Sequence, residues 1–175
     1  MIELGRERGL ADHHAKGRLY LGWSIAVGGQ PDHGIAMIEE AFKIQRGSGT
    51  PEDFQIYSDM LAEVLVAAGR VWLALDEVER AIAESEARAW PIWLPELHRR
   101  RGEVLLAMSV PCADEAEVCF GEALTLARNL RSRSLELRAA RNLARLWAEQ
   151  SRRSEARDLL APIYRCFTED STRRI

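Results

Sequence analysis

Apolar residues recur along this chain at intervals of three and four, which is the period of an amphipathic helix. The clearest examples are Leu61, Leu65 and Val66, followed by Leu75, Val78 and Ile82. No segment shows the strict alternation of apolar and polar residues that is typical of a half-buried strand. The pattern therefore predicts an all-α protein with helices at about residues 10–28, 32–46, 51–68, 71–88, 92–108, 113–130, 134–150 and 154–167.

The predicted helices group into four pairs that repeat one pattern of small residues. The first helix of each pair carries one of them, at Gly22, Ala62, Gly102 and Ala144. The second helix carries another, at Gly34, Ala74, Ala116 and Ala156, and both series keep a period of about 40 residues. A large side chain at these positions would push the paired helices apart, so we expect close packing there. The repeat predicts one helical domain over 1–175, with repeats at 10–48, 50–89, 91–130 and 133–168 and a short tail at 169–175.

Glycine and proline mark the predicted helix ends. Gly28, Gly29 and Gly69 follow first helices of pairs, where a residue in the left-handed conformation is favoured. Thr50 and Pro51 precede the third helix and supply a capping hydroxyl and a proline suited to the first helical position. The turns therefore divide the chain at the same places as the small-residue pattern.

Two levels of family resemblance follow from these residues. The series Gly22, Gly34, Ala41 and Ala62, Gly69, Ala74, Ala81 resembles the tetratricopeptide repeat, although the period near 40 implies longer helices than that family has. The segments PELHRRRGEVLLA, AEVCFGEALTLAR, RSLELRAARNLARLW and RRSEARDLLAPIYRCFTE, within about 95–169, resemble the C-terminal repeats of large bacterial signalling ATPases linked to adenylate or guanylate cyclase domains. The resemblance implies a tetratricopeptide-like α-solenoid, a right-handed superhelix of antiparallel helix pairs. It also implies a detached or truncated regulatory module that acts as a protein–protein interaction scaffold in signal transduction.

Composition and charge narrow the classes of partner. The chain has 175 residues, 47% of them hydrophobic, and a formal net charge of −3, which disfavours a general nucleic-acid binder. No apolar run approaches the roughly 18 residues of a membrane span. The three cysteines form no CxxC pair, and Glu3 and Arg6 interrupt the apolar residues at the N-terminus, unlike a signal peptide. We expect a cytoplasmic protein with reduced thiols and with neither nucleic acid nor membrane as its partner.

The sequence offers little material for catalysis. His13 and His14 are adjacent, so on a helix their side chains diverge and do not converge on one metal ion. No nucleophile motif of the GxSxG type occurs, and no phosphate-binding loop of the GxxxxGKS or GxxxxGKT type. The ATPase and cyclase activities of the resembled proteins therefore do not carry over. We expect no enzyme activity, no cofactor and no metal site.

A candidate binding face can be read from the outward positions of the first helices, which line the concave side of stacked helix pairs. Arg138, Arg141 and Arg145 follow helical spacing, and their guanidinium groups suit the carboxylates of an acidic peptide. The alternative is a solvated charged surface with no ligand. The face comprises Lys16, Tyr20, Trp23, Asp59, Glu63, Arg99, Glu103, Arg138, Arg141 and Arg145, with Leu19, Ile56, Met60, Glu96, Arg100 and Asn142 at neighbouring outward positions.

A second candidate surface lies on the last predicted helix. Its apolar residues are Leu159, Leu160, Ile163, Tyr164 and Phe167, and no polar capping helix is evident after them. Residues 131–175 also contain eleven arginines against six acidic residues, so the charge of the chain is unevenly distributed. Both features favour a homodimer formed through this edge or docking to an acidic neighbour.

The burial of four tryptophans can be predicted from their positions on the helices. Trp72 and Trp147 lie on apolar helical stripes and are expected in the core, whereas Trp90 and Trp93 flank a helix start and are expected to be exposed.

One alternative function is a regulatory fragment of a cyclase or ATPase enzyme with no activity of its own. A weaker alternative is a nucleic-acid contact through the C-terminal arginines.

Overall fold

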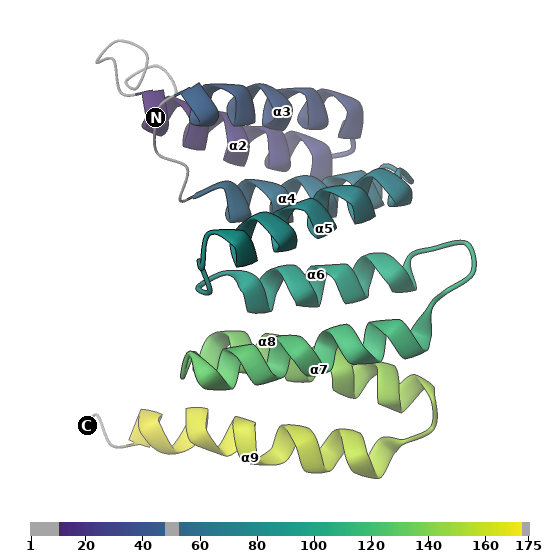
Figure 1. Ribbon diagram of the computed structural model, residues 1–175. Coiled ribbons are helices and arrows are strands. Elements are labelled where there is room, and N and C mark those ends of the chain that lie inside the picture. Colours follow the sequence, from purple (N-terminus) through teal and green to yellow (C-terminus); the bar gives the residue numbers. More distant parts are fainter. Residues whose placement is uncertain (1–10, 48–52, 173–175) are drawn as a thin grey trace. The chain divides into compact units, whose positions relative to one another are not determined.

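The computed structural model describes residues 11–47 and 53–172, and this part of the chain is entirely helical (Figure 1). The predicted all-α class and the predicted helices are confirmed, with ends that differ by a few residues. The last helix runs about five residues further than predicted, to Thr172, and contains Pro162. The helices are α2 (Ala11–Val27), α3 (Pro31–Gly47), α4 (Phe54–Ala67), α5 (Val71–Ala87), α6 (Leu94–Leu106), α7 (Ala113–Asn129), α8 (Arg133–Glu149) and α9 (Arg153–Thr172).

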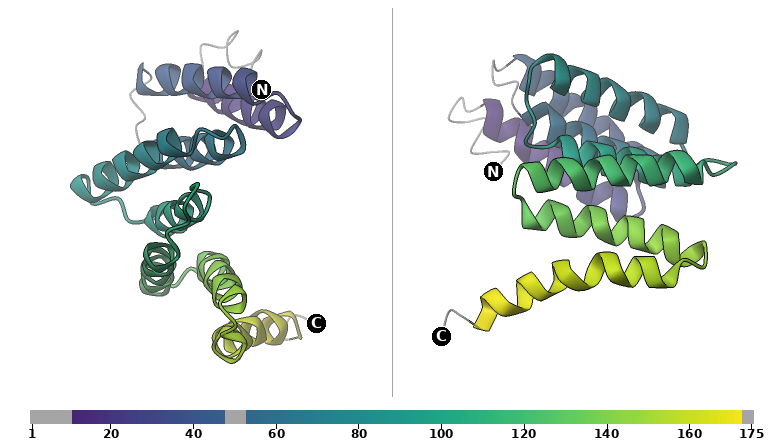
Figure 2. Two further views of the ribbon diagram at one scale, coloured as in Figure 1. Left: turned by 90° about the vertical axis from the view of Figure 1, so that its right-hand side faces the viewer. Right: turned by 60° about the horizontal axis from the view of Figure 1, so that its bottom comes forward.

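The chain forms two compact units, Met1–Ala87 and Arg88–Ile175. Consecutive helices pack as antiparallel pairs, α2 on α3 and α4 on α5 in the first unit, and α6 on α7 and α8 on α9 in the second (Figure 2). Within each unit the first helices of the two pairs also contact each other, α2 with α4 and α6 with α8. The boundary falls between the second and third predicted repeats. One domain over 1–175 stays a prediction, as does the right-handed superhelix.

The small residues lie at the closest approaches of the paired helices. Gly22 and Gly34 are both buried, and a Cβ at Gly22 would lie 2.9 Å from the carbonyl oxygen of Gly34. A Cβ at Gly102 would collide with the ring of Phe120, with 2.8 Å to its Cδ1. The alanines of both series are buried as well, with 0% exposure at Ala62, Ala74 and Ala116, 3% at Ala144 and 7% at Ala156. The spacing therefore marks contacts between helices, as the sequence predicts.

Four of the turns share one hydrogen-bond pattern. After α2, the N–H of Gln30 donates to the carbonyl of Ile25 at 3.1 Å, and after α7 the N–H of Ser132 donates to that of Ala127 at 3.0 Å. In each turn, the residue that donates this bond directly follows a residue in the left-handed conformation, which is a common way for a helix to end. The left-handed residues of these four turns are Gly29 (φ 98°) and Gly69 (φ 74°) in the first unit, and Arg131 (φ 52°) and Ser151 (φ 67°) in the second. Glycine therefore signals only half of these turns. The predicted cap at Thr50 and Pro51 lies outside the described residues.

The prediction for Trp72 is wrong, and the other three tryptophans are neither in the core nor fully exposed. Trp72 is 69% exposed, because the buried stripe of α5 runs through Ala74, Val78 and Ala81, and Trp72 projects to the opposite side of the helix. Trp147 is half-buried, and its indole Nε1 donates to the carboxylate of Glu117 on α7 at 2.7 Å. Trp90 and Trp93 are also half-buried.

Candidate protein-interaction face

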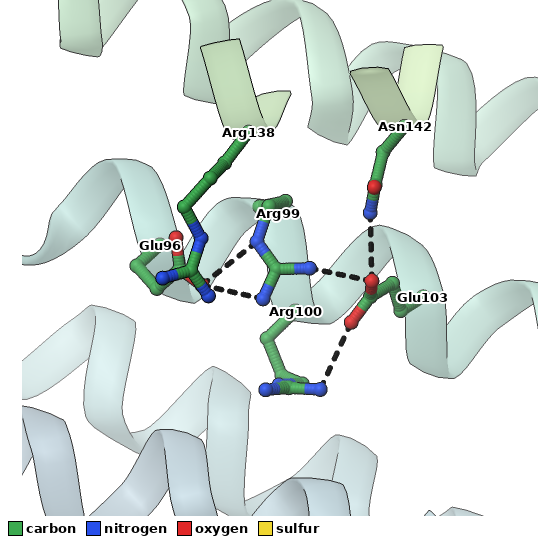
Figure 3. A network of polar contacts seen from close by, with 6 residues as sticks. All are labelled: Glu96, Arg99, Arg100, Glu103, Arg138 and Asn142. Carbon is green, nitrogen blue, oxygen red and sulfur yellow. Dashed lines mark hydrogen bonds and ion pairs between the residues drawn. The ribbon is translucent and has the colours of Figure 1, made fainter. Parts of the chain in front are cut away.

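A buried carboxylate anchors the polar cluster between α6 and α8 (Figure 3). Glu96 on α6 is 1% exposed and accepts hydrogen bonds from Arg99 on the same helix, at 2.8 Å from Nε and 2.5 Å from Nη2. Arg138 reaches across from α8 and donates from Nη2 to the same oxygen at 2.5 Å. A buried carboxylate is unfavourable unless it is paired, and here two guanidinium groups pair with it.

Glu103 lies two helical turns further along α6 and has a similar set of partners. Arg99 Nη1 lies 2.5 Å from its Oε1, and Arg100 Nη1 lies 2.9 Å from its Oε2. The side chain amide of Asn142 on α8 donates to Oε1 at 2.7 Å. Burial would raise the pKa of Glu103, but the charges of Arg99 and Arg100 and the hydrogen bond from Asn142 hold this pKa below its ordinary value. The carboxylate is therefore ionised at neutral pH.

Helical spacing brings this cluster together. Glu96, Arg99, Arg100 and Glu103 are three and four residues apart on α6, and Arg138 and Asn142 are four apart on α8. Burial would lower the pKa of Arg99, but its hydrogen bond and ion pair with Glu96 raise that pKa above its ordinary value. The cluster contains three arginines and two glutamates, so it neutralises its own carboxylates and retains an excess positive charge.

The predicted arginines on α8 fall into two groups. The side chain of Arg138 is 48% exposed and is paired with Glu96. The side chains of Arg141 and Arg145 are exposed and have no hydrogen bond or ion pair with any residue in the described part of the chain. They lie on the same side of α8 as Arg138, at positions three and seven beyond it. Their guanidinium groups are thus open to an external acceptor.

Six of the residues predicted at outward positions are buried: Asp59 and Arg99 of the face, and Leu19, Glu96, Arg100 and Asn142 at the neighbouring positions. The periodicity predicts that Asp59 and Arg99 point outward, whereas Asp59 is 5% exposed and Arg99 is 3% exposed. Arg99 is buried because it bridges Glu96 and Glu103 along its own helix. Its contribution to the surface is to fix the carboxylates that hold Arg138 and Asn142. Glu103, another predicted face residue, is only partly exposed for the same reason.

The other predicted residues of this face belong to the first unit. Lys16 on α2 pairs with Asp53 at 2.7 Å. Tyr20 is 53% exposed, and Trp23 and Glu63 are half-buried. The indole Nε1 of Trp23 has no hydrogen-bond acceptor among the residues that the structure describes. The structure brings the residues of α6 and α8 together within the second unit. A face shared by both units stays a prediction.

The predicted edge on α9 is partly built into the second unit. Ile163 is 4% exposed and belongs to the core, and Leu159 and Leu160 are half-buried. Tyr164 is 64% exposed and Phe167 is 39% exposed. The part of this edge that is open to solvent is therefore aromatic, and its role in self-association stays a prediction.

Sequence reasoning missed a basic hollow at the junction of α7 and α8. Three arginines and Glu136 line it, drawn from the end of α7, the turn and the first turns of α8: Arg128, Arg131, Arg133 and Glu136. The pairing of Arg133 with Glu136 at an interval of three could have been read from the sequence. The approach of Arg128 could not, because it depends on how the turn folds back.

The described residues contain neither a cluster of metal-ligating side chains nor a membrane-spanning helix. No group of three or more histidine, cysteine, aspartate or glutamate side chains is placed to hold a metal ion in this part of the chain. Over the same residues, no helix is both long and apolar enough to cross a membrane.

Comparisons with known proteins bear on the fold. The sequence matches no family profile. It is 26% identical over 146 residues to an uncharacterized protein of Rhizobium meliloti, and the match covers 83% of this chain but only 14% of that relative.

Two solved structures of nearly identical TPR-like repeats, from a kinesin light chain-like protein of Podosopora anserina, are similar to almost the whole chain. One has a TM-score of 0.67 at 18% identity and covers 98% of this chain and 84% of that one. The other has a TM-score of 0.63 at 19% identity, with 93% and 78% covered. The chain therefore has the fold of a tetratricopeptide-like α-solenoid, as the sequence predicts.

Proposed function

We propose that the chain is a non-catalytic protein-interaction module whose α8 face binds an acidic segment of a partner protein. The observation that carries the proposal is the state of Arg141 and Arg145, two exposed guanidinium groups with no partner in the described residues. They lie beside a cluster that already neutralises Glu96 and Glu103 with Arg99, Arg100 and Arg138. An approaching carboxylate thus meets two unpaired cations beside carboxylates that are already neutralised, with the exposed Glu149 one helical turn beyond Arg145.

The chemistry of the face favours carboxylates. A guanidinium group offers a planar pair of N–H donors that matches a carboxylate, and such charge-assisted bonds are stronger than neutral ones. Arg141 and Arg145 are four residues apart, so they lie about one helical turn, or about 6 Å, from each other on α8. Side chains two residues apart on an extended segment have a comparable spacing. A segment with alternate acidic residues is therefore the expected ligand.

The proposal is tested with a fluorescein-labelled peptide of alternating glutamate and alanine, followed by fluorescence anisotropy at low salt. We expect the Arg141→Glu/Arg145→Glu variant to bind at least tenfold more weakly than the wild type, since each lost charge-assisted pair is worth about 1.5–3 kcal/mol. The control is Arg153→Glu/Arg157→Glu, which changes the net charge equally at two exposed arginines of α9. Equal loss in both variants would show unspecific attraction by the basic end of the chain and would refute the proposed face.

A second candidate function is self-association through α9. It is supported by the exposed aromatic side chains of Tyr164 and Phe167, because exposed aromatic residues are enriched at protein interfaces.

We also propose that the interaction module comes from a bacterial signalling protein and is cytoplasmic. Both proposals rest on the resemblance of the repeats around 95–169. The weaker nucleic-acid alternative has no observation that favours it over an acidic peptide.

A further inference from the structure

A surface hollow of about 400 Å³ lies where α7 turns into α8. Its lining consists of three arginines and one glutamate, Arg128, Arg131, Arg133 and Glu136. The arginines come from three consecutive elements: the end of α7, the connecting turn and the start of α8. The hollow is therefore fixed by the fold of the turn and does not depend on one helix face alone.

Glu136 holds two of the arginines in place. It is 5% exposed, and its carboxylate accepts from Arg128 Nε and from Arg133 Nη1, both at 2.9 Å. Each of its oxygens is thus engaged by one arginine, which fixes the direction of both guanidinium groups. The Nη atoms of Arg128 have no hydrogen bond among the residues that the structure describes.

The charge of the hollow is unbalanced. Three guanidinium groups face one carboxylate, so the lining carries an excess of two positive charges. The side chain of Arg131 has no hydrogen bond or ion pair in the described part of the chain. It is exposed at the tip of the turn, beside the two arginines that Glu136 holds. An anion entering the hollow would therefore find donors from at least Arg128 and Arg131.

We propose that this hollow is a binding site for a phosphomonoester group. A phosphomonoester carries close to two negative charges at neutral pH and has three terminal oxygens, which match the excess charge and the three converging arginines. A carboxylate has one charge and two oxygens and would leave part of this lining uncompensated. The volume exceeds that of a phosphate group, so the carrier of the phosphate also has room.

The site differs from the acidic-peptide face of the proposed function. Arg141 and Arg145 lie two and three helical turns further along α8 and do not line the hollow. Either site can therefore fail its test without affecting the other. The phosphate could come from a small metabolite or from a phosphorylated side chain, and the two sources have the same chemistry at the lining.

The first experiment titrates the full chain with inorganic phosphate at pH 7.5 and follows the arginine Nε–H signals by NMR. We expect a dissociation constant on the order of 1 mM, with shifts at Arg128 and Arg131. Arg131→Gly should weaken phosphate binding about tenfold, as should Arg128→Gln, and acetate should bind at least tenfold more weakly than phosphate. The Arg141→Glu/Arg145→Glu variant should bind phosphate as the wild type does.

Ser151→Gly provides the matched control for Arg131→Gly. Both replace a residue in the left-handed conformation at equivalent turns, so both relieve the same backbone strain, but only one removes a guanidinium group from the hollow. A weaker affinity in Arg131→Gly alone therefore cannot result from misfolding. Unchanged phosphate affinity in both Arg131→Gly and Arg128→Gln would overturn the proposal, as would phosphate-induced shifts confined to Arg141 and Arg145.

A second experiment identifies the source of the phosphate. A phosphoserine peptide and its unphosphorylated form are titrated beside inorganic phosphate under the same conditions. Tighter binding of the phosphopeptide than of phosphate indicates a phosphorylated protein partner, and equal binding indicates a free phosphate compound. Equal binding of the two peptides would contradict a phosphate site.

Discussion

At the scale of single residues, the absence of a side chain determines how closely α2 and α3 approach. Gly22 and Gly34 face each other, and an added Cβ on either residue would meet the backbone of the other helix. Backbone atoms cannot move aside as a flexible side chain can, so the two helices would have to separate. Gly121 on α7 is different, because a Cβ there would have no atom within 4 Å.

Gly34→Ala is therefore expected to destabilise the chain, by about 1–3 kcal/mol after the overpacking outweighs the better helix propensity of alanine. Gly121→Ala makes the same chemical change in an open position, and it should stabilise by up to about 1 kcal/mol. Urea denaturation followed by circular dichroism measures both. If Gly34→Ala were as stable as Gly121→Ala, the close approach of α2 and α3 would be wrong.

At the scale of helices and turns, the sequence predicts which segments are helical and where paired helices approach closely. It does not predict the conformation of every turn or the burial of every side chain. The helices follow from apolar spacing, and the close contacts follow from Gly22, Gly34 and Gly102. The turns at Arg131 and Ser151 carry no glycine, so their left-handed conformation could not be predicted from the residue type. The periodicity identified the positions on α6 and α8 but could not show that Arg99 is buried, since burial depends on its neighbours.

The carboxylate of Glu103, which accepts a hydrogen bond from Asn142 on α8, makes the free energy of unfolding depend on pH. Because the pKa of Glu103 is lowered in the folded state, its ionised form stabilises the fold above the pKa of the unfolded chain, near 4.5. This contribution is lost as the pH falls through the lower, folded-state pKa. We expect the free energy of unfolding to decrease between pH 5 and pH 3, and to decrease less in Glu103→Gln, which should already be about 1–3 kcal/mol less stable at pH 7. Urea denaturation across this range measures the difference, and parallel curves for the two proteins would contradict the assignment.

At the scale of the whole molecule, the two units differ in charge. The second unit carries the arginine-rich segment 131–175 and, on α6 and α8, the cluster that neutralises its own glutamates. The first unit has Tyr20 and Trp72 as exposed aromatic residues. A partner that binds through charge is therefore expected to contact the second unit.

Self-association is the prediction that belongs to this scale. Tyr164→Ser/Phe167→Ser removes the exposed aromatic surface of α9, so we expect it to shift a dimer towards monomer. Light scattering at low and high salt measures the mass, and an apolar contact should persist at high salt. Trp72→Ser is the control, since it removes an exposed aromatic residue from α5 and should leave the mass unchanged. A wild-type chain that is monomeric at high concentration would refute the dimer.

The polar cluster between α6 and α8 also limits how this protein can change by rearrangement of its repeats. Hairpins of a solenoid are often treated as exchangeable modules, because each one contacts mainly its neighbours. Here Glu96 depends on Arg138, and Glu103 depends on Asn142, so the third hairpin carries two charges that the fourth must complete. A duplication or deletion that separated these hairpins would remove one hydrogen-bond donor from each carboxylate and leave the buried Glu96 with Arg99 as its remaining partner. The last two hairpins are therefore expected to be inherited together, as one indivisible segment.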